Sequence, residues 1–302
     1  MKILHVWDQA GVSCLLALYQ RKLGHQADVI MREEFSAGML ELYGLTEKMV
    51  FLNEKIDPLS PIRKAYYRLP KQVQGTIRPL KRKMRSLRFY FQVSKMAHSY
   101  DVIHIHSCWM AVFLLPFKKK IIHWHGDECR VKPCLTPKFK WLLTHFFIKF
   151  YSRNHEMYVS TPDILSCVPK SVWLPNPVDI NLFHERNLSK PNTALYCLNW
   201  YEDGSHAQKI AKAEELDLTI LDRRNAKNWI RHEYFADYLA AFEFYIDRQA
   251  IPSLSKTALE ALSLGLKVVQ GWDNKIIEGL NPRHDPEVCA RRTLEIYERL
   301  LA

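Results

Sequence analysis

Residues 2–31, KILHVWDQAGVSCLLALYQRKLGHQADVIM, set the fold class of this chain. Residues 2–7 form a short apolar run, Gly11 follows in a turn, and residues 12–23 have helical apolar spacing that stops at a glycine. A second apolar run covers residues 27–31. Strand, glycine turn, helix and strand make a βαβ unit, whose crossover forces the two strands to be parallel. The segment therefore predicts an α/β fold.

The same alternation continues through the 302 residues and restarts once. Further strands are predicted at 101–105, 120–124, 156–160, 172–174, 193–198, 217–221, 244–246 and 266–270, and helices at 138–151, 206–215, 256–264 and 286–301. Pro175-Asn176-Pro177 breaks the pattern, as a linker does. We therefore predict two doubly wound, Rossmann-like domains that face each other across a cleft, 1–175 and 176–285, with a C-terminal helix, 286–302, packing back on the first.

The net charge points to an anionic partner. Lys plus Arg number 43 and Asp plus Glu 32, a formal net charge of +11. Residues 58–100 contain eleven Lys or Arg and no acid, so the whole excess lies in this basic tract. Its interleaved aromatic residues predict contact with an anionic membrane surface rather than a nucleic acid, and a solvated helix face is the plainest alternative. Residues 130–153 carry six bases and no acid, which a core helix with a basic outer face also explains.

Cysteine usage and the N-terminus indicate the compartment. Seven scattered cysteines without a C-x-x-C motif argue against a disulfide framework and favour a reducing environment. The N-terminus reaches Asp8 too soon for a signal peptide. The longest apolar run, 108–117, is half of the roughly 20 residues that a membrane span needs. We therefore predict a cytoplasmic protein that is peripheral on the membrane face.

Four histidines occupy two predicted strands, with His104 and His106 on one and His123 and His125 on the next. Each pair has i, i+2 spacing, so both members face the same side of a strand. His125 falls at a strand end and is the candidate catalytic residue, because imidazole titrates near neutrality. His104 and His123 are interpreted as core histidines. A four-histidine zinc site would require the two strands in register and denser ligand spacing, so no metal is predicted.

A second candidate site lies in SLSKTALEALSLG, which begins at Ser253. Ser255 and Thr257 stand where a helix begins, with Lys256 between them. Helix N–H groups, two hydroxyls and an ammonium are suited to hold a diphosphate. Glu260, one turn further, can accept hydrogen bonds from a pair of sugar hydroxyls. A capped helix with a solvated lysine accounts for the same residues.

Gly11 opens the first helix of the chain and is a third candidate. A glycine at that turn lets a ligand approach the backbone, and the helix N-terminus attracts negative charge. The G-x-G-x-x-G fingerprint and the P-loop are absent, so neither a nicotinamide dinucleotide site nor a P-loop is supported. A glycine needed only for the turn is the alternative.

The order of these motifs resembles that of the retaining glycosyltransferases of family four, which have the GT-B architecture. The similar segments are AGVSCLLALYQRKLGHQADVIM at 10–31, DVIHIHS at 101–107, IIHWHG at 121–126, VSTPDILSCVPKSVWLPNPVDINLF at 159–183 and KTALEALSLGLKVV at 256–269. The donor-binding half is shortened and divergent. Pro252 stands where the family has the first of two glutamates, and 198–200 replaces its Gly-Arg pair. Arg223, Arg224 or Lys256 would then supply the missing positive charge.

The resemblance implies metal-independent, retaining transfer of a sugar from a nucleotide diphosphate-sugar, with no further cofactor. By position, His125 would lie near the transferred sugar, Glu260 would hold the donor ribose, and Gly11 would lie under the donor phosphates. A lipid-linked or cell-envelope glycan acceptor would explain the basic tract. Two alternatives stay open on the sequence: a nucleotide-sugar epimerase or hydrolase that uses His125 with Asp127 or Glu128, and a catalytically degenerate module that binds sugar, lipid or RNA.

Overall fold

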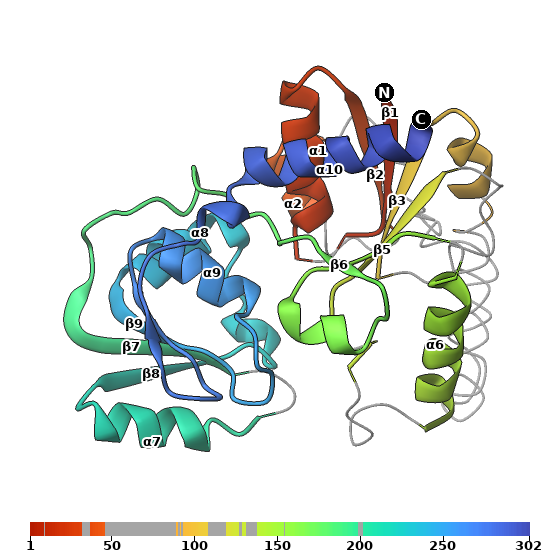
Figure 1. The fold of residues 1–302 in the computed structure, drawn as a ribbon. Coiled ribbons are helices and arrows are strands. Elements are labelled where there is room, and N and C mark those ends of the chain that lie inside the picture. The colour runs from red at the N-terminus through yellow and green to blue at the C-terminus, as the bar shows by residue number, and fades with distance from the viewer. Residues whose placement is uncertain are drawn as a thin grey trace, which may run out of the picture. The chain divides into compact units, whose positions relative to one another are not determined.

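The chain folds into alternating strands and helices around two sheets (Figure 1). The computed structural model describes residues 1–8, 10–31, 37–45, 89, 91, 93–107, 119–126, 129–130, 138–153, 155–198 and 202–302. Of the eleven bases of the basic tract only Lys95 is described, so the membrane contact predicted there lies outside the described residues. Asp127 and Glu128, the acids of the epimerase alternative, also lie outside them.

The first sheet has six strands in the order β2-β1-β3-β4-β5-β6. These are β1 (Lys2–Val6), β2 (Gln26–Ile30), β3 (Val102–His106), β4 (Lys120–Trp124), β5 (Met157–Val159) and β6 (Val172–Trp173). β1 pairs in parallel with β2 and β3, β3 pairs with β4, and β5 pairs with β6. Helix α1 (Val12–Lys22) crosses from β1 to β2. The predicted βαβ unit is therefore confirmed.

The second sheet has five strands in the order β11-β10-β9-β7-β8. These are β7 (Lys190–Leu198), β8 (Asp217–Asp222), β9 (Phe242–Ile246), β10 (Lys267–Val269) and β11 (Ile276–Ile277). All pairs are parallel except the short edge strand β11, which runs antiparallel to β10. The chain leaves β7 toward β8 on one side and returns as β9 on the other. The strand order therefore reverses between β7 and β9, which is the switch point of a doubly wound sheet.

The remaining helices follow the predicted pattern with two additions. They are α2 (Ala37–Leu42), α6 (Lys138–Tyr151), α7 (Ser205–Ala213), α8 (His232–Ala240), α9 (Lys256–Ser263) and α10 (Pro286–Leu301), with short 3₁₀ turns at Pro162–Ser166, Ala226–Asn228 and Pro282–His284. The bounds of α6 and α10 are as predicted. Asp285 caps α10, because its Oδ1 accepts the N–H groups of Glu287 and Val288. Helices α2 and α8 were not predicted.

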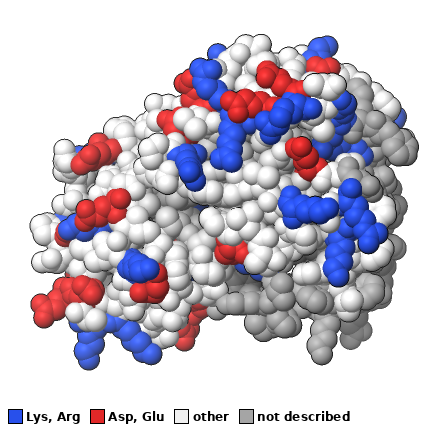
Figure 2. All heavy atoms as spheres, viewed as in Figure 1, with Lys and Arg blue, Asp and Glu red and all other residues white. Residues whose placement is uncertain are grey.

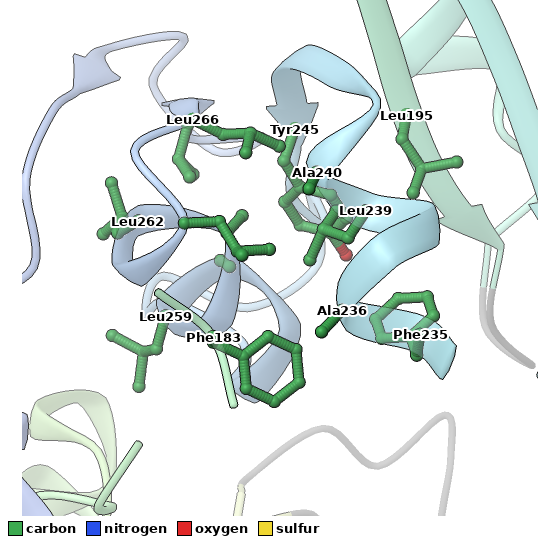
Figure 3. Packing of buried hydrophobic residues seen from close by; sticks show 14 of the residues in the cluster. Phe183, Leu195, Phe235, Ala236, Leu239, Ala240, Tyr245, Leu259, Leu262 and Leu266 are labelled. Atoms are coloured by element: carbon green, nitrogen blue, oxygen red, sulfur yellow. The ribbon is translucent and has the colours of Figure 1, made fainter. Parts of the chain in front are cut away.

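Alternate residues of β7 build a core on each face of the second sheet. On one face, Leu195 and Cys197 pack with helices α8 and α9 (Figure 3). This cluster includes Phe183, Phe235, Ala236, Leu239, Ala240, Tyr245, Leu259, Leu262 and Leu266. On the other face, Ala194, Tyr196 and Leu198 pack with α7. Because strand side chains alternate between faces, a single apolar strand such as β7 supports helices on both sides.

The chain divides into two compact units. Unit 1 contains Met1–His123, Asn154–Glu156 and Ile296–Ala302, and unit 2 contains Trp124–Arg153 and Met157–Glu295. The domain boundaries predicted at 175 and 285 stay predictions. None of the described helices combines the length and the apolar composition that a membrane crossing needs.

Candidate functional site

A pocket of about 290 Å³ lies at the carboxyl end of the second sheet. It is lined by Cys197, Leu198, Arg223, Arg224, Trp229, Tyr245, Asp247, Arg248, Ser255 and Thr257. These residues come from the ends of β7 and β9, from the turn after β8 and from the start of α9. The pocket therefore occupies the switch point, where open α/β sheets bind ligands.

The start of α9 forms one wall of the pocket. Ser255 is the N-cap, and its Oγ accepts the N–H of Ala258 at 3.0 Å. The hydroxyl of Thr257 accepts a hydrogen bond from Arg223 Nη1 at 3.3 Å. In both bonds the hydroxyl is the acceptor, so the hydroxyls of this wall can still donate to a ligand that lies beside the positive end of the helix dipole.

Three arginines line the pocket, and they differ in how their charge is used. Arg224 makes a bidentate pair with Asp222, with N···O distances of 2.8 and 2.9 Å. Arg223 lies 4.3 Å over the ring of Phe235, which holds its guanidinium in place. The Nε of Arg248 is buried and has no hydrogen-bond partner within the described ranges. Arg223 and Arg248 therefore present positive charge that no carboxylate of the described residues pairs directly.

Asp247 is the buried acid of the pocket, and one of its oxygens is unsatisfied. Its Oδ2 accepts the N–H of Ser255 at 2.8 Å, whereas Oδ1 has no partner among the described residues. Burial raises the pKa of this carboxyl, and the charge of Arg248 opposes the shift. A buried oxygen without a donor is destabilising. A hydroxyl or amide of a bound ligand could donate a hydrogen bond to Asp247 Oδ1.

A glycine allows the loop after β9 to take this path. A Cβ on Gly271 would lie 2.3 Å from the carbonyl oxygen of Asp247 and 2.6 Å from the carbonyl carbon of Arg248. Both contacts are to backbone, which cannot rotate away as a side chain can. Gly271 therefore sets the position of the two charged residues of the pocket.

Lys256 points to the Pro-Asn-Pro segment. Its ammonium donates to the carbonyl of Pro177, and His284 Nδ1 contacts the carbonyl of Asn176 at 2.8 Å. The Sγ of Cys289 donates to Pro175 O at 3.5 Å. The three residues together fix the segment predicted as a linker. A role for Lys256 toward phosphate stays a prediction.

Glu260 is buried one turn into α9, with 3% of its surface exposed. Burial raises its pKa to about 7, although the charges of Lys256 and Arg223 oppose the shift. His232 Nε2 lies 3.9 Å from Glu260 Oε1. Burial lowers the pKa of His232 to about 4, with Lys256 and Arg223 acting in the same direction. The pair is therefore not an ion pair at neutral pH, and Glu260 exchanges its proton in the range where acid–base catalysts work.

His125 follows β4 and carries no charge at neutral pH. Burial lowers its pKa to about 3, and the neighbouring Asn176 side chain partly offsets this. A neutral imidazole donates and accepts hydrogen bonds but does not supply positive charge. The structure thus leaves His125 a hydrogen-bonding role, and its predicted part in catalysis stays a prediction.

Gly11 begins α1 in the left-handed region, with φ 77°, but the helix end it opens is already occupied. Asp8 Oδ2 accepts the N–H of Gly11 at 2.8 Å, and Oδ1 accepts the N–H and the hydroxyl of Ser13 at 2.9 and 2.5 Å. The Cys14 N–H lies 3.4 Å from the same Oδ1. A carboxylate of the protein thus stands where a phosphate was predicted, and the role of Gly11 as a phosphate site stays a prediction.

The structure adds a fifth histidine, His5 on β1, to the two predicted pairs. His5 on β1 is in register with His104 on β3, and His106 is in register with His123 on β4. His104 and His106 stack with ring centroids 4.1 Å apart. Sequence reasoning missed His5 because it lies about a hundred residues from the other rings, although its position in β1 faces the same side.

Side-chain hydrogen bonds link these rings to helix α10. His106 Nε2 and His5 Nδ1 lie 3.0 Å apart, His5 Nε2 lies 2.8 Å from Gln20 Oε1, and Tyr297 Oη lies 2.6 Å from His104 Nδ1. Because Gln20 Nε2 donates to Tyr297 Oη at 3.5 Å, its Oε1 is left to accept from His5 Nε2. His106 then donates to His5, and Tyr297 donates to His104. The histidines His5, His104 and His106 are close enough for a shared metal ion, yet these bonds already use the ligand atoms of His5.

Solved structures place the fold in a known class. The chain is similar to sucrose-phosphate synthase from Thermosynechococcus elongatus, with TM-score 0.54, 16% identity, and coverage of 100% of this chain and 92% of that chain. It is also similar to UDP-N-acetylglucosamine 2-epimerase from Rickettsia bellii, with TM-score 0.54, 9% identity, and coverage of 100% and 97%. Both have the GT-B fold, so the predicted α/β class with Rossmann-like domains is confirmed. No protein-family model and no curated protein sequence matches the chain.

The structure brings Ser255 and Thr257 together with pocket residues that sequence reasoning missed. Arg223 had been named as a source of positive charge, but Asp247 and Arg248 had not. The position of Asp247 and Arg248 could have indicated the site. Both directly follow β9, and in such folds the residues after the carboxyl ends of strands bind ligands.

Proposed function

We propose that this chain is a glycosyltransferase that takes its sugar from a nucleotide diphosphate-sugar. The observation that carries the proposal is the pocket at the switch point of the second sheet. There, Arg223 and Arg248 present positive charge beside the N-terminus of α9, and Asp247 presents a buried acceptor oxygen, and among the residues that the structure describes neither charge has a carboxylate partner and the oxygen has no donor. This combination suits a ligand with a diphosphate and several hydroxyls.

The proposed chemistry needs neutralisation of the leaving diphosphate. Sugar transfer passes through an oxocarbenium-like transition state, and negative charge grows on the departing phosphate. Arg223, Arg248 and the helix dipole supply positive charge without a metal ion. We assign a ribose hydroxyl of the donor to Glu260 and the neighbourhood of the transferred sugar to His125. Retention of configuration, a lipid-linked or cell-envelope acceptor and a cytoplasmic location remain parts of the proposal that rest on sequence.

A nucleotide-sugar epimerase is the second candidate, favoured by Glu260. A buried carboxyl with a pKa of about 7 is suited to take a proton from a substrate and return it. An epimerase would use the same donor pocket but would need no acceptor. The two reactions therefore differ in what they release.

The test is a thermal-shift and calorimetry screen against UDP, GDP, ADP, CMP and their sugars. At 100 times Kd a ligand adds about 2.7 kcal/mol to the free energy of unfolding. We expect one nucleotide to stabilise the wild type and Arg231→Ala, an exposed arginine paired with Glu233, by this amount, and to stabilise Arg223→Ala by only about 0.9 kcal/mol. If no nucleotide binds, both the glycosyltransferase and the epimerase proposals are refuted, and a catalytically degenerate binding module is left as the explanation.

Product analysis separates transferase from epimerase. With the stabilising donor and no acceptor, an epimerase converts the nucleotide-sugar to an isomer. A transferase leaves the donor unisomerised, and release of the nucleotide diphosphate depends on an added acceptor.

A further inference from the structure

Helix α6 exposes a continuous apolar face. Leu142, Phe146 and Phe150 are 61%, 63% and 48% exposed, whereas Ile148 and Tyr151 are 1% and 4% exposed. The first three follow i, i+4, i+8 spacing, so they form one stripe about 12 Å long, at 1.5 Å per residue. We call these three residues the α6 stripe. The helix is therefore apolar on two faces, and only one of them contributes to the core.

Isolated exposed apolar side chains are ordinary, but a stripe is not. Elsewhere in the described chain, no exposed large apolar residue has another one three or four positions away, and Leu188, Ile276 and Val288 are examples. Phe146 and Phe150 also contact the aromatic rings of Phe147 and Tyr151, with centroids 5.7 and 5.4 Å apart. The stripe is thus a supported surface of large rings rather than a set of loose side chains.

The charge around the stripe is of one sign. The sequence from 129 to 155 has six bases and no acid, and five of the bases remain once Arg130, which is largely buried in an ion pair with Asp163, is set aside. Lys149 and Arg153 are exposed at the C-terminal end of α6. Where Figure 1 draws α6, Figure 2 shows basic side chains and no acidic one among the described residues. An apolar stripe flanked by unbalanced positive charge fits a surface that is negative outside and apolar just beneath.

We propose that the α6 stripe docks on an anionic lipid bilayer, with its rings between the headgroups and its bases at the phosphates. Helices of this composition lie in the interface plane, and their apolar side reaches about 5–10 Å into the headgroup region. A second copy of the chain does not fit, because two such faces would bring like charges together. The inference does not depend on the proposed reaction, and it names a surface distinct from the basic tract.

Vesicle binding by the full chain tests the apolar part. We expect the wild type to sediment with phosphatidylcholine vesicles that contain about one-third phosphatidylglycerol, and to bind pure phosphatidylcholine at least about tenfold more weakly. L142S/F146S/F150S should lose at least about tenfold in affinity for the anionic vesicles. The matched control L188S/I276S/V288S removes three exposed apolar residues elsewhere and should bind as the wild type does.

The charged part is tested by one reversal and by salt. K149E should weaken binding to anionic vesicles, while K170E, at an exposed lysine outside α6, should have a smaller effect. Raising the ionic strength from about 0.1 to 1 M shortens the screening length from about 10 to 3 Å and should weaken binding.

Depth of insertion gives a readout that does not depend on a loss of function. With brominated lipids, the added fluorescence of F146W should be quenched and that of L188W should not. Three results would overturn the proposal. The two triple variants could bind vesicles equally well, the wild type could show no preference for anionic lipid, or the wild type could self-associate in a way that L142S/F146S/F150S abolishes. Thermal unfolding of each variant confirms that it is folded, and F146W tests insertion with the apolar face retained.

Discussion

At two helix N-termini of this chain, an aspartate that follows a strand faces the start of the helix, but the two aspartates differ in how many of their oxygens accept hydrogen bonds. Asp8 follows β1 and faces the start of α1, and Asp247 follows β9 and faces the start of α9. Both oxygens of Asp8 accept hydrogen bonds from α1 and its cap. Within the described part of the chain, only one oxygen of Asp247 is used, and two arginines that line the same pocket have no direct carboxylate partner.

The difference indicates which helix end is structural and which is left for a ligand. A helix N-terminus whose N–H groups are saturated by the protein's own carboxylate has little to offer a phosphate. A half-satisfied carboxylate in a cationic pocket is destabilising until a ligand arrives. Substitutions at Asp8, Glu260, Arg223 and Ser255 test this difference between the two helix ends, and their expected effects decrease in that order.

Asp8→Ala should have the largest effect on stability. It removes the acceptor of two backbone N–H groups and a hydroxyl, all of them buried, each costing about 1–3 kcal/mol when left unsatisfied. With some relaxation, we expect a loss of about 4 kcal/mol in the free energy of unfolding, measured by urea denaturation. Asp8→Asn keeps an acceptor and should lose about half as much. An unchanged midpoint for Asp8→Ala would remove the structural half of the comparison.

Glu260→Gln should change how stability depends on pH. The pKa of Glu260 is about 7 in the folded protein against 4.5 as the ordinary value, so the native state binds more protons in between. Its contribution to stability therefore falls as the pH rises from about 4.5 to 7, by roughly 3 kcal/mol. The variant should lack this fall, so its Tm relative to the wild type should rise between pH 5 and pH 8.

Buried histidines also make stability depend on pH, and the comparison of the two proteins has to separate their effect from that of Glu260. Burial lowers the pKa values of His5 and His232 to about 4 and that of His125 to about 3. Their contribution to stability is lost as the pH falls below 6.5, in the variant as in the wild type. Because the histidine contribution is common to both proteins, the difference between their Tm curves isolates Glu260, and parallel curves from pH 4.5 to 7 would show that Glu260 is not the group responsible.

Arg223→Ala should weaken nucleotide binding by roughly thirtyfold, or about 2 kcal/mol, since hydrogen bonds to charged groups contribute about 1.5–3 kcal/mol. Calorimetry with the nucleotide that stabilises the wild type measures this. Arg224→Ala is the close control, because its guanidinium is held by Asp222. Equal losses for the two arginines would mean that net positive charge, and not an unpaired guanidinium, determines binding.

Ser255→Ala should have the smallest effect. It removes one cap hydrogen bond, to the N–H of Ala258, which is worth about 1 kcal/mol. Thermal unfolding should show the loss, and Ser255→Thr should restore most of it. A loss as large as that of Asp8→Ala would mean that the two helix ends are equally dependent on their caps.

Most of the fold could be predicted from local pattern, because strands and helices leave their period in the sequence. The bounds of α6 and α10 were predicted to the residue. Helix α8 was missed because two of its four buried residues, Ala236 and Ala240, are alanines, which give little apolar contrast.

The site was harder to predict than the fold because it is made where distant segments converge. The hydroxyls of Ser255 and Thr257 have the expected position, but their hydrogen-bond partners could not be inferred from spacing. Asp8 stands shortly before the glycine of the predicted turn, and nothing in the neighbouring sequence shows that its carboxylate accepts the N–H groups at the start of α1. Asp247 and Arg248 enter the pocket only because β9 ends beside β7.

The hydrogen bond between Tyr297 and His104 has a consequence for how the chain matures. Unit 1 begins at the first residue but includes Ile296–Ala302, so it lacks one of its own parts until nearly the whole described chain has left the ribosome. Domains usually fold in the order in which they are made, at about 5–20 residues per second of synthesis. Here the unit translated first is completed last, and during that interval the imidazole of His104 lacks the phenol of Tyr297.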